Sequence, residues 1–556
     1  MTRVFSILEA QPMPRFAVSI ACALVPLALA SSAHGQGAVD ARIVGTDSIF
    51  ARFDRPGSPG CVAAVMRAGE MGFARGYGMA NVELGVPLTP QSVFDGGSLA
   101  KQFTAFTVAL LAREGKLSLD DDVRRYVPEL PDHGDTVTLR HLLHHTSGVR
   151  EYGELQFLAS NDLAPWELVV RQEGLSFAPG EAHLYSNSGY LLLGRVVEKV
   201  EGKPLADVLR ERIFRPLGMT STKLIRRADE LVPGRADAYG ERGGQWLLLM
   251  DDAPPDAGPA SVFTSPADLA KWDRNFYDAA VGGPEVVRMM TTPGKLRNDR
   301  PIEYALGLHT GEYRGVRRIR HGGLWRGYRH QFSRFPDQRT SVLVMCNHFT
   351  EPNALNDRVA DIWLSEHLAP LPAPAAAGAD SAALARYAAT YVSRESQSLR
   401  PVRFAAGGGL EMRLWATFYP LRPMGGGRFA VVGTPSFVTF RPGGAGEMRM
   451  EEAAEGDAPT LFERIPDGAA APAPLADYAG AFRSEELESE WRLEARGDTL
   501  VRRVGRDEDA LRPAGRDAFT DGYLLVVFTR GAAGRVDGFT VATPRVRGVR
   551  FVRSGR

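Results

Sequence analysis

Gly96-Gly97-Ser98-Leu99-Ala100-Lys101 is the most informative stretch of this 556-residue sequence, because it places a serine and a lysine where a glycine turn leads into an apolar run. The pattern predicts a helix from Ser98 to Arg113. Side chains three residues apart on a helix share one face, so the amine of Lys101 would reach the hydroxyl of Ser98. Serine is a weak nucleophile that needs an adjacent base, and a lysine of lowered pKa provides one. The same spacing also arises by coincidence, so the stretch needs support from elsewhere in the chain.

Tyr185-Ser186-Asn187 is a second candidate, placed between Pro179-Gly180 and a helix predicted for residues 190–200. A tyrosine beside a cationic lysine can ionise or relay protons, and an asparagine can hold both a lysine and a substrate amide. The alternative is an ordinary turn, in which tyrosine and asparagine are common.

His321-Gly322-Gly323 is a third candidate, at the end of a strand predicted for residues 316–320. Paired glycines at a strand edge let a substrate backbone approach closely. The histidine adds a hydrogen-bond donor, or a charge if it is protonated. The alternative is a plain Gly-Gly bend.

The order Ser-x-x-Lys, Tyr-x-Asn and His-Gly-Gly resembles that of the penicillin-recognising serine hydrolases. Within them the chain is similar to the class C β-lactamase branch, which includes carboxypeptidases, D-aminopeptidases and esterases. The resemblance covers about residues 40–370. Four further stretches also match this branch: Leu142-Leu143-His144-His145-Thr146-Ser147-Gly148, the run from Tyr185 to Gly194, Pro216-Leu217-Gly218-Met219 and Ser265-Pro266-Ala267-Asp268-Leu269.

The resemblance implies a role for each matching residue. Ser98 would be the acylated nucleophile, and Lys101 would take or relay its proton. Tyr185 would be the general base for attack and the general acid for the leaving group. Asn187 would orient the lysine and the substrate, while the backbone N–H groups of Ser98 and Leu324 would form an oxyanion hole. Which of Lys101 and Tyr185 is the formal base stays open, since the two would titrate as a coupled pair.

The third motif departs from the Lys-Thr-Gly of β-lactamases. His321 replaces the lysine and Gly322 replaces the threonine, while Gly323 is retained. This removes a cation and a hydroxyl that grip a substrate carboxylate, so an efficient penicillinase is not expected. The motif is more similar to that of the D-aminopeptidases and some esterases. In the D-aminopeptidases, a loop from a C-terminal barrel reaches the active site.

The chain divides into three parts after residues 1–33, which have the pattern of a signal peptide. Residues 38–370 read as α/β, with strands at 61–66, 327–334 and 341–346 around a helical middle and a closing helix at 357–367. This pattern predicts a sheet closed by both ends of the domain. The resemblance implies an antiparallel sheet flanked by helices, a helical lobe and an active site between them.

Residues 383–465 and 475–556 are two copies of one unit, each preceded by a linker rich in proline and alanine. Leu384-Ala385-Arg386-Tyr387 aligns with Leu475-Ala476-Asp477-Tyr478. Short alternating runs between glycine-rich turns predict two small antiparallel β-barrels or sandwiches. Neither copy contains a nucleophile–base pair, so no chemistry is assigned to them.

Composition limits the partners and the compartment. The 66 basic residues balance the 66 acidic ones, which argues against a nucleic-acid partner. No segment after the signal is long and apolar enough to span a membrane, so we expect a periplasmic or secreted protein without stable membrane insertion. Cys61 and Cys346 are expected to be buried free thiols. His141 and His145 have a metal-ligand spacing but lack the accompanying glutamate, so neither a metal nor a cofactor is expected.

These observations predict an exported serine hydrolase that acts through an acyl-enzyme on amide or ester bonds of small peptide-like or ester substrates. The alternatives are a D-stereospecific aminopeptidase or a D-Ala-D-Ala-type carboxypeptidase. A different class of protein, a non-catalytic binder of a peptide or cell-wall ligand, would be expected to have lost one of the three reactive residues. The sequence makes no prediction about oligomeric state.

Overall fold

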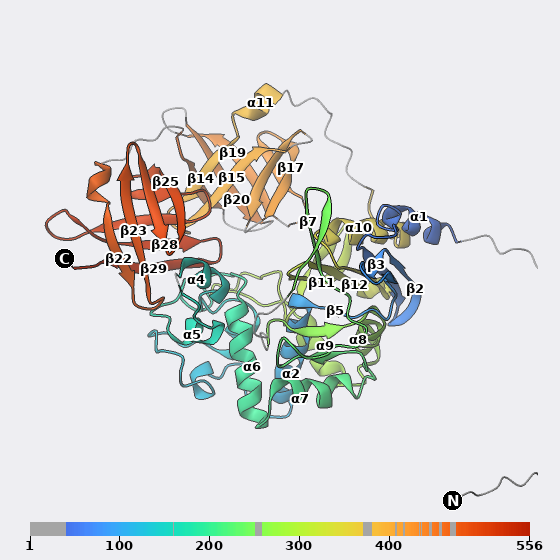
Figure 1. The fold of residues 1–556 in the computed structure, drawn as a ribbon. Helices are drawn as coiled ribbons and strands as arrows, with labels where there is room; N and C mark the ends of the chain where they lie inside the picture. Colours follow the sequence, from blue (N-terminus) through green and yellow to red (C-terminus); the bar gives the residue numbers. More distant parts are fainter. Residues whose placement is uncertain are drawn as a thin grey trace, which may run out of the picture.

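The computed structural model describes residues 40–555, except 160, 251–257, 371–380, 406–407, 415–416, 433, 435, 444–446, 455–458 and 467–473. The predicted signal peptide and most of both linkers therefore lie outside the described residues. Figure 1 shows an α/β domain with two β-barrels beside it, the first drawn in orange and the second in red. The predicted fold class, a β-lactamase-like domain followed by two barrels, is confirmed.

A six-stranded antiparallel sheet forms the centre of the α/β domain. The strand β1 lies between the late strand β13 and the early strand β2, so both ends of the domain close the sheet as predicted. In spatial order the strands are β10 (His309–Tyr313), β11 (Val316–Trp325), β12 (Tyr328–Phe335), β13 (Thr340–Cys346), β1 (Cys61–Arg67) and β2 (Glu70–Tyr77).

Cys61 and Cys346 form a disulfide, so the prediction of free thiols is wrong. The two residues stand directly opposite each other in the β1–β13 pair, with Cα atoms 4.0 Å apart. Sequence reasoning placed both cysteines in buried strands. It missed the bridge because the register between strands 285 residues apart is set by tertiary packing.

Both faces of the sheet are covered, which explains why β1 is apolar along its whole length. Cys61, Ala63 and Val65 pack with α1 (Ala41–Phe50) and α10 (Pro352–Trp363). The alternate residues of β1 pack into the larger core with α2 (Ala100–Arg113), α8 (Pro266–Asp278) and α9 (Gly283–Thr291). The helix α10 begins at Pro352, five residues before the predicted start.

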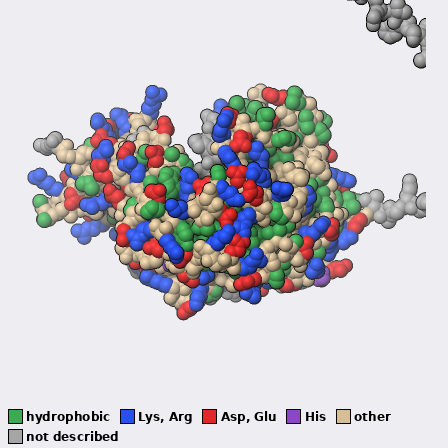
Figure 2. All heavy atoms as spheres, turned by 90° about the horizontal axis from the view of Figure 1, so that it is seen from below, with side chains coloured by type: hydrophobic (Ala, Val, Ile, Leu, Met, Phe, Trp, Pro, Cys, Tyr) green, Lys and Arg blue, Asp and Glu red, His purple; other side chains and the backbone are tan. Residues whose placement is uncertain are grey.

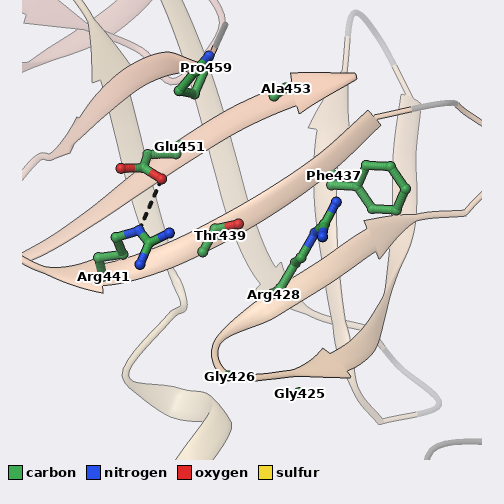
Figure 3. A pocket seen from close by; sticks show the side chains of 9 residues that line it. All are labelled: Gly425, Gly426, Arg428, Phe437, Thr439, Arg441, Glu451, Ala453 and Pro459. Atoms are coloured by element: carbon green, nitrogen blue, oxygen red, sulfur yellow. Dashed lines mark hydrogen bonds and ion pairs between the residues drawn. The ribbon is translucent and has the colours of Figure 1, made fainter. Parts of the chain in front are cut away.

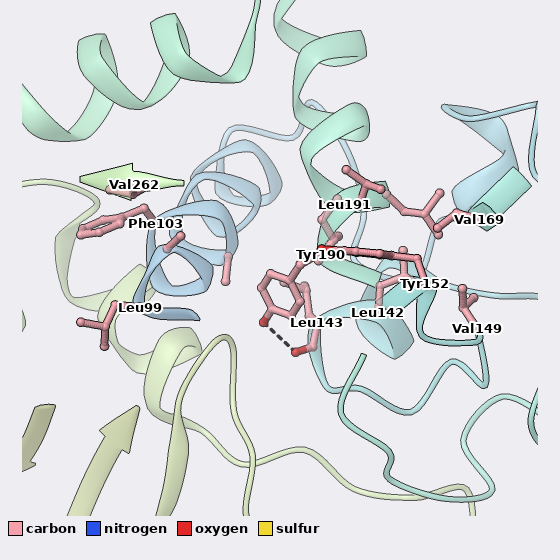
Figure 4. Packing of buried hydrophobic residues seen from close by; sticks show 14 of the residues in the cluster. Leu99, Phe103, Leu142, Leu143, Val149, Tyr152, Val169, Tyr190, Leu191 and Val262 are labelled. Carbon is pink, nitrogen blue, oxygen red and sulfur yellow. Dashed lines mark hydrogen bonds between the residues drawn. The ribbon is translucent and has the colours of Figure 1, made fainter. Parts of the chain in front are cut away.

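A helical lobe packs against α2 and faces the sheet domain. Figure 4 shows its core, where the Tyr190 hydroxyl donates a hydrogen bond of 3.0 Å to the carbonyl of Leu143. Its longest helix starts at Asn187, three residues before the predicted start. The lobe contains α3 (Leu139–Leu143), α4 (Tyr152–Leu158), α5 (Pro165–Val170), α6 (Asn187–Glu201), α7 (Leu205–Leu209) and the π-helical turn η3 (Arg210–Phe214).

Short strands and turns complete the domain. Three small sheets lie outside the main sheet, and the short helical turns lie in the loops. The strands are β3 (Met79–Asn81) with β4 (Val86–Pro87), β5 (Phe94–Asp95) with β9 (Val262–Thr264) and β6 (Lys223–Leu224), and β7 (Tyr239–Arg242) with β8 (Gln245–Leu248). The turns are η1 (Gly97–Leu99), η2 (Val123–Arg125) and η4 (Pro336–Gln338).

The two C-terminal repeats are closed eight-stranded antiparallel barrels. Barrel 1 consists of β14 (Ala389–Ser393), β15 (Ser398–Phe404), β16 (Leu410–Leu414), β17 (Thr417–Gly425), β18 (Arg428–Val431), β19 (Ser436–Pro442), β20 (Met448–Ala454) and β21 (Thr460–Arg464), preceded by α11 (Ser381–Ala385). Barrel 2 consists of β22 (Gly480–Ser484), β23 (Ser489–Arg496), β24 (Thr499–Val504), β25 (Asp507–Gly515), β26 (Ala518–Thr520), β27 (Leu525–Arg530), β28 (Val536–Thr543) and β29 (Val546–Arg553), preceded by the turn η6 (Leu475–Asp477).

The repeat seen in the sequence corresponds to matching positions in the two barrels. Phe462 and Phe551 are both fully buried in their barrel cores. The register also shifts at the same place in each copy, between Pro423 and Gly425 in barrel 1 and between Pro513 and Gly515 in barrel 2. An irregularity preserved in both copies supports duplication of one unit.

Barrel 2 docks tightly onto the helical lobe. The side chains of Arg150 and Glu486 form an ion pair of 2.7 Å and are only 5% and 2% exposed. The indole N–H of Trp491 donates to the carbonyl of Leu158 at 2.9 Å. The apolar core of barrel 2 is continuous with that of the lobe, so the two pack as one body.

The surface is of mixed charge, and Figure 2 shows basic and acidic side chains interspersed on the face that it presents. This distribution agrees with the balanced composition. Within the described part of the chain, no helix combines the length and apolar character that a membrane span requires.

Candidate active site

Ser98 and Lys101 lie at the junction of η1 and α2, where the turn presents the serine and the first helical turn carries the lysine. Ser98 is partly exposed, whereas Lys101 is fully buried. The Lys101 Nζ lies 3.1 Å from the Ser98 Oγ. It also donates to the Asn187 Oδ1 at 2.7 Å and to the Pro259 carbonyl at 3.0 Å. These acceptors hold the amine beside the hydroxyl, the arrangement needed for proton transfer from serine.

Tyr185 lies beside this pair, with its ring centroid 5.0 Å from the Lys101 Nζ. Its hydroxyl oxygen is out of contact with solvent and has no regular hydrogen-bond partner among the described residues. Removal from water raises the pKa of Tyr185 well above its usual value, while the Ser98 hydroxyl opposes this rise. A buried phenol without a partner requires an explanation, and a substrate leaving group would supply the missing partner.

Asn187 is oriented by Glu151, a residue that sequence reasoning missed. The Asn187 side-chain Nδ2 donates to the Glu151 Oε1 at 2.8 Å, and its backbone N–H donates to the other carboxylate oxygen. These two bonds point the amide oxygen of Asn187 at Lys101. Glu151 directly precedes α4 and is only 1% exposed, and its carboxylate lies at the start of α6, where a negative charge is favoured. No motif or spacing in the sequence linked Glu151 to the site.

The turn η1 and the strand β11, whose backbone N–H groups are expected to form the oxyanion hole, lie against each other. A Cβ on Gly97, whose φ is +52°, would lie 2.8 Å from the Leu324 nitrogen. A Cβ on Gly323 would lie 2.1 Å from the carbonyl oxygen of Gly96. Only glycine allows this approach on either side, which gives Gly97 and Gly323 a structural reason. The turn bearing the Ser98 N–H is thereby brought next to the strand bearing the Leu324 N–H.

His321 lies behind Tyr185, with ring centroids 6.0 Å apart. Its Nδ1 lies 2.7 Å from the Gly322 carbonyl, and its Nε2 lies 3.1 Å from the Tyr304 hydroxyl. A carbonyl only accepts, so Nδ1 carries the proton and Nε2 accepts from Tyr304. Burial and the nearby Lys101 charge lower the pKa of His321 to about 3. At neutral pH this histidine is therefore uncharged and bonded to protein atoms through both nitrogens.

The histidines that had a metal-ligand spacing bind backbone atoms instead. The Nδ1 of His141 accepts from the Thr138 N–H at 3.3 Å, and the Nδ1 of His145 accepts from the Ser186 N–H at 3.2 Å. Among the described residues, no group of three or more metal-binding side chains is placed to hold an ion.

The hairpin between β28 and β29 brings barrel 2 to the edge of the site. The Nε of Arg545 lies 3.4 Å from the Glu154 Oε1. Its charge is close enough to Tyr185 to oppose the rise in the phenol pKa. The β28–β29 hairpin therefore places an arginine of barrel 2 against a carboxylate of α4.

A separate hollow of about 410 Å³ lies on the wall of barrel 1 (Figure 3). It is lined by Gly425, Arg428, Phe437 and an ion pair of 3.0 Å between Arg441 and Glu451. All its lining residues belong to barrel 1, and none is a serine, cysteine or lysine. The reactive groups described above lie elsewhere, so this hollow is not the candidate active site.

Comparison with known proteins bears on the family and the fold of the chain. The Beta-lactamase family model matches residues 46–364. Penicillin-binding protein 4* of Bacillus subtilis is 32% identical over 302 residues, which are 50% of this chain and 66% of that protein. A D-aminopeptidase of Gluconobacter oxydans is 30% identical over 308 residues, 54% of this chain and 57% of that protein. The chain thus spans less than two thirds of these two relatives.

A relative from Brucella canis matches over nearly its full length. This D-aminopeptidase is 27% identical over 520 residues, which are 89% of this chain and 96% of that protein. Among solved structures, the octameric penicillin-binding protein homologue from Pyrococcus abyssi has a TM-score of 0.54 and 22% identity, and covers 76% of this chain and 98% of that one. This last likeness concerns the fold alone.

Proposed function

The chain belongs to the Beta-lactamase family, and from this premise we propose that it is an exported serine hydrolase that cleaves amide or ester bonds through an acyl-enzyme on Ser98. One observation carries the proposal, the buried Lys101 amine held 3.1 Å from a partly exposed serine hydroxyl. The relatives named D-aminopeptidase and penicillin-binding protein support a peptidase-like hydrolase.

The reaction proceeds in two halves. The Ser98 oxygen attacks the substrate carbonyl as its proton passes to the Lys101–Tyr185 pair, and the backbone N–H groups of Ser98 and Leu324 stabilise the oxyanion. The same pair protonates the leaving amine or alcohol. Water then attacks the acyl-enzyme, gives up a proton to the pair and restores the serine hydroxyl. Asn187 keeps Lys101 in place throughout, and Glu151 keeps Asn187 in place.

A D-amino-acid amide or peptide is the favoured kind of substrate within this class. The full-length match to the Brucella D-aminopeptidase includes the region of both barrels. The His-Gly-Gly motif also lacks the lysine expected of an efficient β-lactamase. A D-Ala-D-Ala-type carboxypeptidase is the second candidate, supported by the match to penicillin-binding protein 4*.

Export is supported by the disulfide that joins β1 to β13. Disulfides form and persist in the periplasm or outside the cell, and they are rare in the cytosol. The N-terminal pattern at residues 1–33 is that of a signal peptide. The N-terminus of the mature protein, sequenced from the periplasmic fraction, should begin near residue 34.

Ser98→Ala tests the proposal, with Ser58→Ala as the matched control, because Ser58 is a partly exposed serine whose hydroxyl donates to the Pro59 carbonyl. The Ser98→Ala variant should lose covalent labelling by a fluorophosphonate probe and all turnover of p-nitrophenyl esters, D-alanyl amides and D-Ala-D-Ala peptides. The Ser58→Ala variant should retain both. Labelling that survives in a folded Ser98→Ala variant would refute the nucleophile and with it the proposed function.

A further inference from the structure

His145, which the proposed mechanism does not use, holds the backbone on both sides of Tyr185. Its carbonyl oxygen accepts from the Leu184 N–H at 2.9 Å, and its side-chain Nδ1 accepts from the Ser186 N–H at 3.2 Å. Both bonds come from one residue, so they fix residues 184–186 against the loop that follows α3. Tyr185 is the middle residue of this segment, and its backbone has little freedom to move.

The imidazole of His145 also packs against the phenol. The ring centroids of His145 and Tyr185 are 4.3 Å apart, with the ring planes inclined by 41°. The rings of Tyr304 and Tyr190 contact the same imidazole, with centroids at 4.6 and 5.1 Å. His145 is only 1% exposed. The phenol therefore rests against a ring that is itself held in place by its neighbours.

The Tyr185 hydroxyl depends on these contacts for its position. It is buried and has no regular hydrogen-bond partner among the described residues, so no bond of its own orients it. Its position follows from the backbone and the ring of the tyrosine. Because His145 contacts both, one residue determines where the reacting oxygen lies.

His145 carries two features that cost free energy. Its φ is +57°, in the left-handed region that residues other than glycine rarely adopt. Since Nδ1 accepts from Ser186, Nε2 carries the proton of the neutral ring, and this buried atom has no hydrogen-bond partner in the described part of the chain. Strained backbone and an unpaired buried N–H are each unfavourable. Their coincidence at a residue beside the reacting groups indicates a functional role.

The imidazole is neutral at neutral pH. Burial, followed by the charges of His183 and Lys101, holds the pKa of His145 well below its usual value. Nδ1 therefore keeps the lone pair that accepts from Ser186. A protonated ring would lose this acceptor and would set a second N–H against that of Ser186.

We propose that His145 is a positioning residue for Tyr185, which fixes the phenol hydroxyl where it exchanges a proton during acylation. This inference rests on the proposed hydrolase function and adds the residue that places its acid–base group. His145 exchanges no proton in this role, and its bonds to Leu184 and Ser186 stay intact through the reaction. Because it acts through Tyr185, its effect should disappear when the phenol hydroxyl is removed.

Two substitutions of His145, each made in the wild type and in Tyr185→Phe, test this role. His145→Ala removes both the ring and the acceptor. His145→Asn removes the ring but keeps an acceptor oxygen at the place of Nδ1 in the side chain, and asparagine tolerates a positive φ. The acylation rate constant and the apparent dissociation constant of one fluorogenic ester are measured for each variant, together with thermal unfolding.

His145→Ala should lower the acylation rate constant by about 100-fold, roughly the effect of misplacing a reacting group by 1 Å. The apparent dissociation constant should change by less than about threefold, because His145 positions the acid–base group and not the substrate. His145→Asn should lower the rate constant by only about tenfold, because the bond to Ser186 is restored. In the Tyr185→Phe background neither substitution should cost more than about threefold, since no hydroxyl is left to position.

His348→Ala is the matched control. His348 is also buried, its Nδ1 bonds the Phe349 carbonyl at 3.0 Å, and its Nε2 has no hydrogen-bond partner among the described residues. Its ring packs against Phe53 and Trp246 rather than Tyr185. His348→Ala should leave the acylation rate constant unchanged, whatever its effect on the unfolding temperature.

The outcomes separate the inference from the proposed function. A loss of equal size in both backgrounds, or no loss in a folded His145→Ala variant, overturns the inference and leaves the hydrolase intact. If His145→Ala does not fold, the two His145→Asn variants decide in the same way: a loss confined to the protein with the hydroxyl supports the inference, and equal losses overturn it. A protein in which neither the ester nor a fluorophosphonate probe acylates Ser98 overturns the proposed function, and the inference with it.

Discussion

The two barrels have the same fold but make different use of their surfaces. Glu486 of barrel 2 is buried against Arg150, whereas the equivalent Glu395 of barrel 1 is exposed. Trp491 donates to the helical lobe, and its equivalent Arg400 pairs with Glu452 inside barrel 1. The shared fold depends on the aromatic cores, while docking onto the catalytic domain depends on a few surface residues that differ between the copies.

The apolar cores of the two barrels also differ in whether they join the core of the catalytic domain. The apolar core of barrel 1 forms a cluster of its own. That of barrel 2 belongs to the same cluster as the catalytic domain. Barrel 2 is therefore expected to share its stability with the active site, and barrel 1 to contribute less to it.

Replacing the two equivalent glutamates should give the largest difference between the barrels, measured as the change in the free energy of unfolding. Glu486→Gln leaves Arg150 buried without its counterion and should lower the free energy of unfolding by about 3 kcal/mol. Glu395→Gln removes an exposed charge and should change it by less than about 0.5 kcal/mol. Urea denaturation followed by tryptophan fluorescence measures both. Equal effects of the two substitutions would show that barrel 2 is not fixed by this ion pair.

Turnover by the Glu486→Gln and Glu395→Gln variants gives a second test of the comparison between the barrels. Arg150 also donates to the carbonyls of Arg547 and Gly548 in the β28–β29 hairpin, at 3.0 and 2.8 Å. Because this hairpin lies at the edge of the site, Glu486→Gln should reduce turnover of a p-nitrophenyl ester at urea concentrations well below the one that unfolds the protein. Glu395→Gln should leave turnover unchanged. A Glu486→Gln variant of full activity would separate the docking of barrel 2 from the active site.

The catalytic domain and the barrels should also differ in how their stability depends on pH. This difference should be small at neutral pH and grow on acidification. All eleven histidines precede residue 368, so neither barrel contains one. Burial lowers the pKa of His321 to about 3 and those of His144 and His330 to about 4. A lowered folded-state pKa gives stability that is present above the unfolded value, about 6.5, and is lost as pH falls toward the folded value.

The catalytic domain should accordingly lose protection from hydrogen exchange between about pH 6 and pH 4, before the core of barrel 1 does. Peptide-resolved hydrogen exchange at several pH values, corrected for the intrinsic exchange rate, measures this order. Barrel 1 opening first, or all parts opening together at one pH, would contradict it.

Features that leave a local pattern in the sequence could be predicted. Features that depend on contacts between distant parts of the fold could not. The apolar run at residues 61–66 indicated a buried strand, and the repeat indicated two similar β units. The spacing of Ser98 and Lys101 reflects one helical turn, so it could be read locally. The disulfide depended on the register of two distant strands. Glu151 and Arg545 come to the site through the packing of α4 and barrel 2, which no local pattern records.

The central claim is that Ser98, Lys101 and Tyr185 act as one unit, and a double-mutant cycle tests it most directly. The acylation rate constant is measured for the wild type, Lys101→Ala, Tyr185→Phe and the double variant with one fluorogenic ester. Each single substitution should cost two to four orders of magnitude, roughly the effect of losing a general base. The double variant should be no more than about tenfold slower than the slower single variant, because groups that act together lose their effect together. Losses that multiply in the double variant would show that the amine and the phenol act independently and would contradict the account.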